Sequence, residues 1–102
     1  MDTLNKERAA VPPHVLVRLL GGESVLLNLD TERYFGLDET GTRMWLLVTT
    51  LPNIGAAYRE LLAEFDVEPE MLRTNLTELL DRLVENGLLQ VLPADVGKAA
   101  AV

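Results

Sequence analysis

The spacing of apolar residues changes near residue 38, and this change divides the chain into two regions. Before it, runs rich in β-forming residues occupy positions 15–20, 24–29 and 33–37. Gly21-Gly22 separates the first two runs, and Asp30-Thr31-Glu32 separates the next two. Links of this length join antiparallel neighbours, so we predict a three-stranded antiparallel meander.

After residue 38 the apolar residues recur every three or four positions, which predicts helices. Asp38 or Thr40 can cap a first helix, and Asn53 can cap a second. A third helix begins at Pro69, because proline fits the first helical turn, and ends before Gly87, a residue suited to a left-handed helix stop. Three strands followed by three helices predict an α+β fold of the winged helix-turn-helix kind, in which short amphipathic helices cover a small sheet.

The two ends of the chain differ in character from the middle. Residues 1–13 are mixed and polar and end in Pro12-Pro13, so we expect a flexible N-terminal arm. Residues 93–102 begin with proline and are rich in alanine, which predicts a flexible C-terminal tail. The folded domain is therefore expected to span residues 14–92, and 102 residues allow one core only.

The charge of the chain excludes several classes of partner. Nine basic and sixteen acidic residues give a formal net charge of −7, whereas proteins that bind nucleic acids neutralise phosphates with clustered lysine and arginine. No apolar run approaches the roughly 20 residues that span a bilayer, and the N-terminus lacks the pattern of a signal peptide. We expect a soluble cytoplasmic protein without a nucleic-acid or membrane partner.

No group of residues has the composition of a catalytic, metal or cofactor site. The chain has no cysteine and a single histidine, His14, which has no nucleophile nearby in the pattern to activate. A run of acidic residues between 60 and 70 lacks the alternation and central glycine of a calcium loop, so a solvated helix face explains it better. We therefore predict a protein that is not an enzyme and holds no metal or cofactor.

The third predicted strand has the features of a binding edge. It contains Arg33, Tyr34, Phe35, Gly36 and Leu37, with no proline and one charge, and an unprotected edge strand accepts another extended chain. Such an edge binds a peptide through main-chain hydrogen bonds while alternate side chains enter pockets. The third helix has a broad apolar stripe that can either pack in the core or line the same groove, and the open edge also permits a homodimer.

The segment from Ser24 to Trp45, SVLLNLDTERYFGLDETGTRMW, resembles the PqqD-like family, and the stretch from Glu64 to Leu89 is similar to the second block of that family. The resemblance covers about residues 14–92. It implies a winged helix-turn-helix domain that recognises the leader peptides of ribosomally made, post-translationally modified peptides. It further implies that the leader is presented to a modifying enzyme, such as a radical-SAM enzyme or a leader peptidase.

In this family the leader adds as a strand to the third β-strand and lies against the third helix. Carried onto this sequence, the resemblance implies peptide contacts by residues 33–37 of the strand. The helix residues that it implies are Leu72, Asn75, Leu76, Leu79 and Arg82.

Two other functions are compatible with the predicted order of elements. A winged-helix transcription regulator would place the third helix in DNA, but that helix contains four carboxylates and two arginines, Arg73 and Arg82, where a recognition helix is normally basic or neutral. A regulatory scaffold subunit of an enzyme would bind its partner without a leader peptide. Both alternatives stay open at the level of the sequence.

Overall fold

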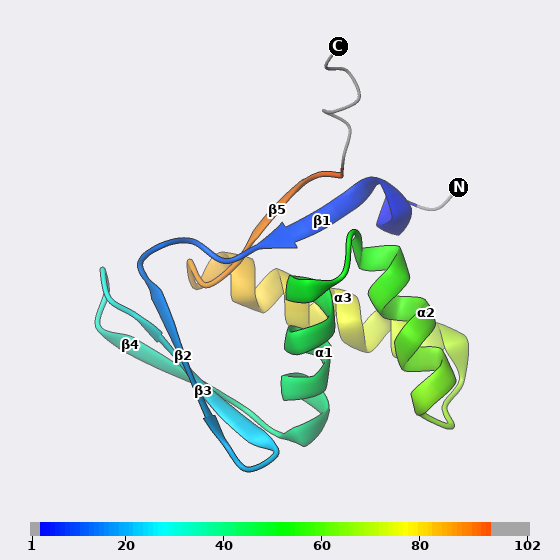
Figure 1. The fold of residues 1–102 in the computed structure, drawn as a ribbon, viewed down its shortest axis with the longest axis horizontal. Helices are drawn as coiled ribbons and strands as arrows, with labels where there is room; N and C mark the ends of the chain where they lie inside the picture. The colour runs from blue at the N-terminus through cyan, green and yellow to red at the C-terminus, as the bar shows by residue number, and fades with distance from the viewer. Residues whose placement is uncertain (1–2, 95–102) are drawn as a thin grey trace.

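Three strands pair as the predicted meander, and three helices lie to one side of it (Figure 1). The computed structural model describes residues 3–94. The sheet has the order β2-β3-β4 and is formed by β2 (Val15–Leu20), β3 (Glu23–Asn28) and β4 (Arg33–Leu37). The helices are α1 (Glu39–Thr50), α2 (Ile54–Glu64) and α3 (Pro69–Glu85). The predicted α+β architecture is confirmed.

Local signals in the sequence explain where the helices begin and end. Asp38 Oδ1 accepts a hydrogen bond from the N–H of Gly41 at 2.8 Å, and this cap starts α1 directly after β4. Asn53 Oδ1 accepts from the N–H of Ala56 at 2.7 Å and starts α2. Gly87 follows α3 with a φ of 70°, a left-handed conformation that glycine adopts without steric cost.

The N-terminal segment differs from the flexible arm that we expected. Thr3–Lys6 forms a short 3-10 helix (η1), and Glu7–Ala10 forms a strand (β1) that pairs antiparallel with β5 (Gln90–Pro93). Leu4 and Ala9 are buried in the core and hold this segment in place. The folded unit thus begins well before residue 14. The first residue of the expected C-terminal tail, Pro93, is the last residue of β5, and Ala94 follows it. Residues 95–102 of the expected tail lie outside the described residues.

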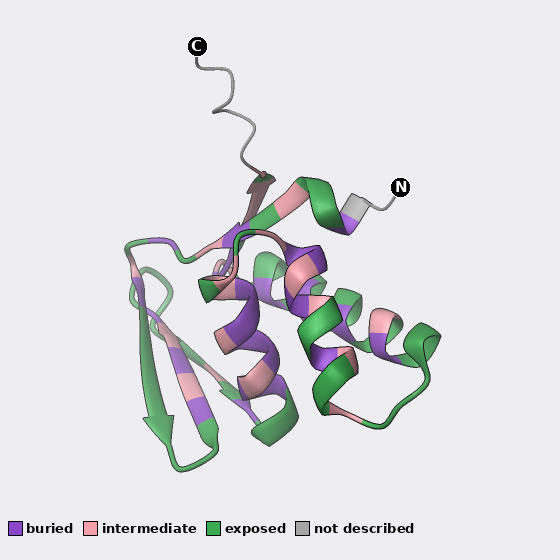
Figure 2. Cartoon of the chain, turned by 45° about the vertical axis from the view of Figure 1, so that its right-hand side comes forward, coloured by how far each residue is buried: buried purple, intermediate pink, exposed green. Residues whose placement is uncertain are grey.

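The core lies between the helices and one face of the sheet (Figure 2). Its most deeply buried large side chains include Leu26 of β3, Leu61 of α2, and Leu76 and Leu83 of α3. By contrast, five of the six residues of β2 are exposed, so this edge strand contributes little beyond Val15 to the core. No helix within residues 3–94 is both long enough and apolar enough to cross a membrane.

Candidate functional site

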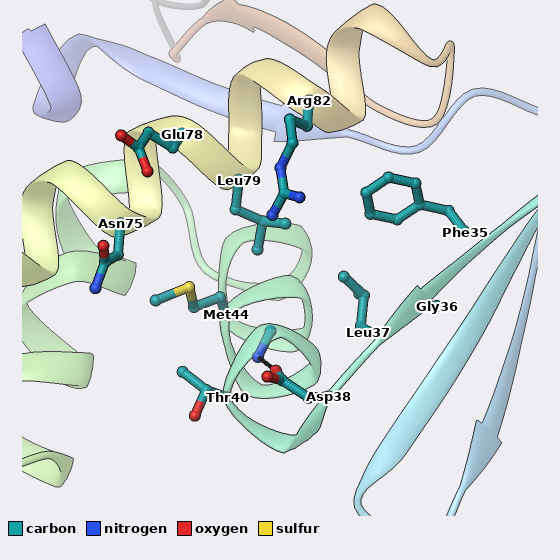
Figure 3. A pocket seen from close by; sticks show the side chains of 11 residues that line it. Phe35, Gly36, Leu37, Asp38, Thr40, Met44, Asn75, Glu78, Leu79 and Arg82 are labelled. Atoms are coloured by element: carbon teal, nitrogen blue, oxygen red, sulfur yellow. Dashed lines mark hydrogen bonds between the residues drawn. The ribbon is translucent and has the colours of Figure 1, made fainter.

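A groove of about 450 Å³ lies between β4, the start of α1 and one face of α3 (Figure 3). The strand and the cap that follows it form one wall, and α3 forms the other. The residues that line it are Phe35, Gly36, Leu37, Asp38, Thr40, Gly41, Met44, Asn75, Glu78, Leu79 and Arg82.

The groove has an apolar floor and a charged rim. Leu37, Met44 and Leu79 are nearly buried and form the floor, each from a different element. Phe35 is half-buried beside them, and the guanidinium carbon of Arg82 lies 5.7 Å from the centre of its ring. A cation at this distance from an aromatic ring is attracted to its face, so this contact links α3 to β4 across the groove.

The main chain of β4 faces open space along this groove. Within the sheet β4 pairs only with β3, so its other edge has no strand beside it. The carbonyl of Asn28 accepts a hydrogen bond from the N–H of Glu32 at 2.7 Å, which shows that the main chain of Asn28 faces β4. The side to which the main-chain N–H and C=O groups point alternates from one strand residue to the next. Asn28 lies opposite Arg33 in the observed register, so the odd-numbered residues of β4 bond to β3. Tyr34 and Gly36 therefore direct their N–H and C=O groups to the open edge.

A buried asparagine fixes the distance between sheet and helix at the far end of the groove. Asn28, 3 % exposed, donates through Nδ2 to the carbonyl of Asn86 at 2.9 Å, just after α3. Its Oδ1 accepts from the N–H groups of Asp30 and Thr31 in the turn before β4, at 2.9 and 3.2 Å. One side chain thus ties that turn to the end of α3. A second hollow, between the same turn and the residues after α3, extends the surface beyond Arg33.

The structure brings together six of the ten residues predicted for the site: Phe35, Gly36, Leu37, Asn75, Leu79 and Arg82. Leu72 and Leu76 are buried in the core, at 3 % and 0 % exposure, and are not among the residues that line the groove. Arg33 lines the second hollow. Tyr34 is 72 % exposed and contributes its side chain to the opposite face of the sheet, because neighbouring strand residues alternate in direction.

Five lining residues were not predicted from the sequence, and they come from two elements. Asp38, Thr40, Gly41 and Met44 belong to the cap and first turns of α1. Glu78 belongs to α3, where Asn75, Glu78, Leu79 and Arg82 follow the spacing of a single helix face. That spacing is visible in the sequence and could have identified Glu78.

The two acidic side chains of the groove come from different elements, Asp38 from the cap of α1 and Glu78 from α3. Among residues 3–94, no three His, Asp or Glu side chains are placed to hold a metal ion. A carboxyl group with a clearly lowered pKa, that of Glu64, lines a different hollow beside α1. There the hydrogen bond from Arg43 holds the pKa of the Glu64 carboxyl below its ordinary value. The groove offers an open strand edge, an apolar floor and fixed charges, which are features of a binding surface.

Comparison with known proteins agrees with this geometry. The model of the family described as coenzyme PQQ synthesis protein D (PqqD) matches residues 23–89. The chain belongs to the PqqD family. The matched segment of this PqqD-family chain runs from the start of β3 to beyond the end of α3 and so includes both walls of the groove.

A solved structure is also similar to the PqqD-family chain. It is described as TbiB1 in complex with the TbiA(beta) leader peptide and superposes with a TM-score of 0.72 at 30 % sequence identity. The match covers 79 % of this chain and 94 % of TbiB1. No curated protein sequence matches the chain.

Proposed function

We propose that this chain is a non-catalytic domain that binds the leader peptide of a ribosomally synthesised precursor and presents it to a modifying enzyme or a leader peptidase. In this proposal the leader adds to β4 as a further strand and lies against α3. The observation that carries it is the open edge of β4 beside a groove with an apolar floor. Main-chain pairing supplies part of the affinity, and side-chain contacts in the groove supply selectivity.

The comparisons support the proposal. A relative that covers most of this chain holds a leader peptide, and the family match includes β4 and α3. The site residues proposed for the leader are the predicted ones that line the two hollows, Arg33, Phe35, Gly36, Leu37, Asn75, Leu79 and Arg82, together with the main chain of Tyr34.

Main-chain pairing along β4 supplies too little binding energy for micromolar affinity by itself. Tyr34 and Gly36 offer four main-chain groups, and a hydrogen bond contributes about 1 kcal/mol net. Four such bonds give roughly 4 kcal/mol, which corresponds to a Kd of about 1 mM. Micromolar binding requires about 8 kcal/mol. A leader bound at that affinity therefore needs further contacts, and burial of an apolar side chain against Leu37, Met44 and Leu79 can supply them.

A proline substitution in the edge strand tests the proposal. Gly36→Pro removes one N–H that has no partner in the sheet, and an added Cβ at Gly36 meets no atom within 4 Å. Proline is tolerated on an edge when its nitrogen faces solvent. We expect the fold to persist and the affinity for a leader peptide, taken from a precursor gene beside the gene for this chain, to fall about tenfold or more.

The opposite edge of the same sheet provides a matched control. The His14 carbonyl accepts from the N–H of Leu29 at 2.8 Å, and the same alternation directs the N–H of Val17 to the open edge of β2. Val17→Pro therefore removes an equivalent group without touching the groove, and Gly36→Ala controls for the loss of glycine. Val17→Pro should bind the leader as the parent chain does, and Gly36→Ala, which keeps the N–H, should bind it more tightly than Gly36→Pro. Equal loss of binding in Val17→Pro and Gly36→Pro, or no loss in either, would contradict the proposal.

A further inference from the structure

The guanidinium of Arg82 is a cation in the groove that has no carboxylate oxygen within ion-pair distance among residues 3–94. Among the lining residues Arg82 is the only basic one, and the others include two acids, Asp38 and Glu78. Ion pairs within residues 3–94 include those of His14 with Asp30 and of Arg43 with Glu64. Arg82 takes part in neither of them. Its guanidinium instead lies beside the ring of Phe35.

The basic side chain and the acidic side chains lie at different ends of the groove. Arg82 extends from α3 toward Phe35, whereas Glu78 and Asn75 lie on the other side of Leu79, and Asp38 lies at the start of α1 (Figure 3). The Oδ1 atom of Asp38 is engaged with the main chain of Gly41, which fixes the position of this carboxylate. An extended peptide in the groove thus passes a cation at the Phe35 end and anions at the Leu37 end.

The chemistry of Arg82 favours a carboxylate over other groups. A guanidinium presents several N–H donors in a planar fork that fits the two oxygens of a carboxylate. Attraction to the Phe35 ring, 5.7 Å away, favours the position of the guanidinium in the groove and leaves its N–H groups available to an anion. A neutral amide at the same place would accept one hydrogen bond and gain no charge attraction.

The geometry of a strand and of a helix sets how many leader residues separate the apolar side chain on the groove floor from the side chain that meets Arg82. Along a strand, residues i and i+2 point to the same side and lie about 6.6–6.8 Å apart. Leu79 of the floor and Arg82 are three residues apart on α3, an axial rise of about 4.5 Å, and the reach of the arginine side chain toward Phe35 adds to this separation. A leader side chain two positions from the one that packs on the groove floor therefore meets Arg82.

We infer that the bound leader carries an aspartate or glutamate two residues from its apolar anchor, on the side of Phe35 and Arg82. On the other side of the anchor, toward Asp38 and Glu78, a neutral or basic residue is favoured. The inference rests on the proposed function and specifies the chemistry of its ligand. The chain as a whole has a net charge of −7, so a carboxylate elsewhere on the leader is repelled.

Selection from a displayed library of random ten-residue peptides tests this inference without knowledge of the natural leader. The full chain, Arg82→Gln, Arg82→Glu and the control Arg18→Gln serve as targets, since Arg18 lies on β2, away from the groove. We expect the parent chain and Arg18→Gln to enrich an acidic residue two positions from an apolar one. Arg82→Gln should lose this preference, and Arg82→Glu should replace it with lysine or arginine.

Affinities of synthetic peptides complete the test. Changing the selected acid to its amide should weaken binding to the parent chain about tenfold at low salt, and should have little effect on binding to Arg82→Gln. Peptides enriched for an apolar anchor with no acidic preference, or a preference unchanged in Arg82→Gln, would overturn the inference and leave leader binding intact. If every selected peptide binds Gly36→Pro as tightly as it binds the parent chain, then no peptide depends on β4. That result would overturn the proposed function, and the inference with it.

Discussion

Replacing Asn28 by alanine removes the side chain that ties the turn before β4 to the end of α3. The substitution deletes donors and acceptors for Asn86, Asp30 and Thr31, at 2.9, 2.9 and 3.2 Å. A neutral hydrogen bond contributes about 1 kcal/mol net, so the loss of three lowers the free energy of unfolding by about 2–3 kcal/mol. For a domain of this size, 1 kcal/mol corresponds to roughly 4–8 °C in Tm, and we expect a fall of about 10–20 °C.

Urea unfolding and leader titration separate the two consequences of this change. Asn53→Ala is the control, because it removes an asparagine that caps α2 and costs about 1 kcal/mol. Under conditions where both variants are folded, Asn28→Ala should bind the leader more weakly because the groove is no longer fixed at that end. Asn53→Ala should bind it normally. A loss of stability below 1 kcal/mol in Asn28→Ala, or equal leader affinity in both variants, would refute the reasoning.

Three further predictions follow from the fold. Removing residues 1–10 deletes β1 and the buried Leu4 and Ala9, so thermal unfolding should occur at lower temperature than in the full chain, in contrast to removal of a flexible arm. Leu76→Ala should cost about 2–5 kcal/mol in urea unfolding yet leave the leader affinity of the folded protein unchanged, because Leu76 is fully buried. Because the hydrogen bond from Arg43 lowers the pKa of Glu64, this pair stabilises the fold fully above the ordinary value of 4.5 and loses its effect as the pH falls from that value through the lowered pKa. The small difference in Tm between the parent chain and Glu64→Gln should therefore vanish once the pH lies below both.

Elements with local signals could be predicted from the sequence. The caps at Asp38 and Asn53 and the stop at Gly87 depend on residues within one turn of the helix ends, and all three lie where the pattern indicates. The edge position of β4 follows from short links between successive strands. These features need no information from distant parts of the chain.

Features that depend on distant residues could not be predicted in this way. The strand β1 is stabilised by β5, about eighty residues later in the chain, and its four residues carry too few alternations to identify it alone. On α3 the apolar stripe is broad, and the sequence does not determine how the helix is rotated against the sheet. The observed rotation buries Leu72 and Leu76 and turns Asn75, in the same stretch, to the groove.

Hydrogen exchange of the β4 amides, followed by NMR, tests the central claim most directly. In the free chain the N–H groups of Tyr34 and Gly36 face the open edge and should exchange quickly, as should that of Val17 on β2. With a saturating leader peptide, exchange at Tyr34 and Gly36 should slow at least tenfold while Val17 stays unchanged. Unchanged exchange at Tyr34 and Gly36 with the leader bound, or protection that appears on β2 instead, would contradict strand addition at β4.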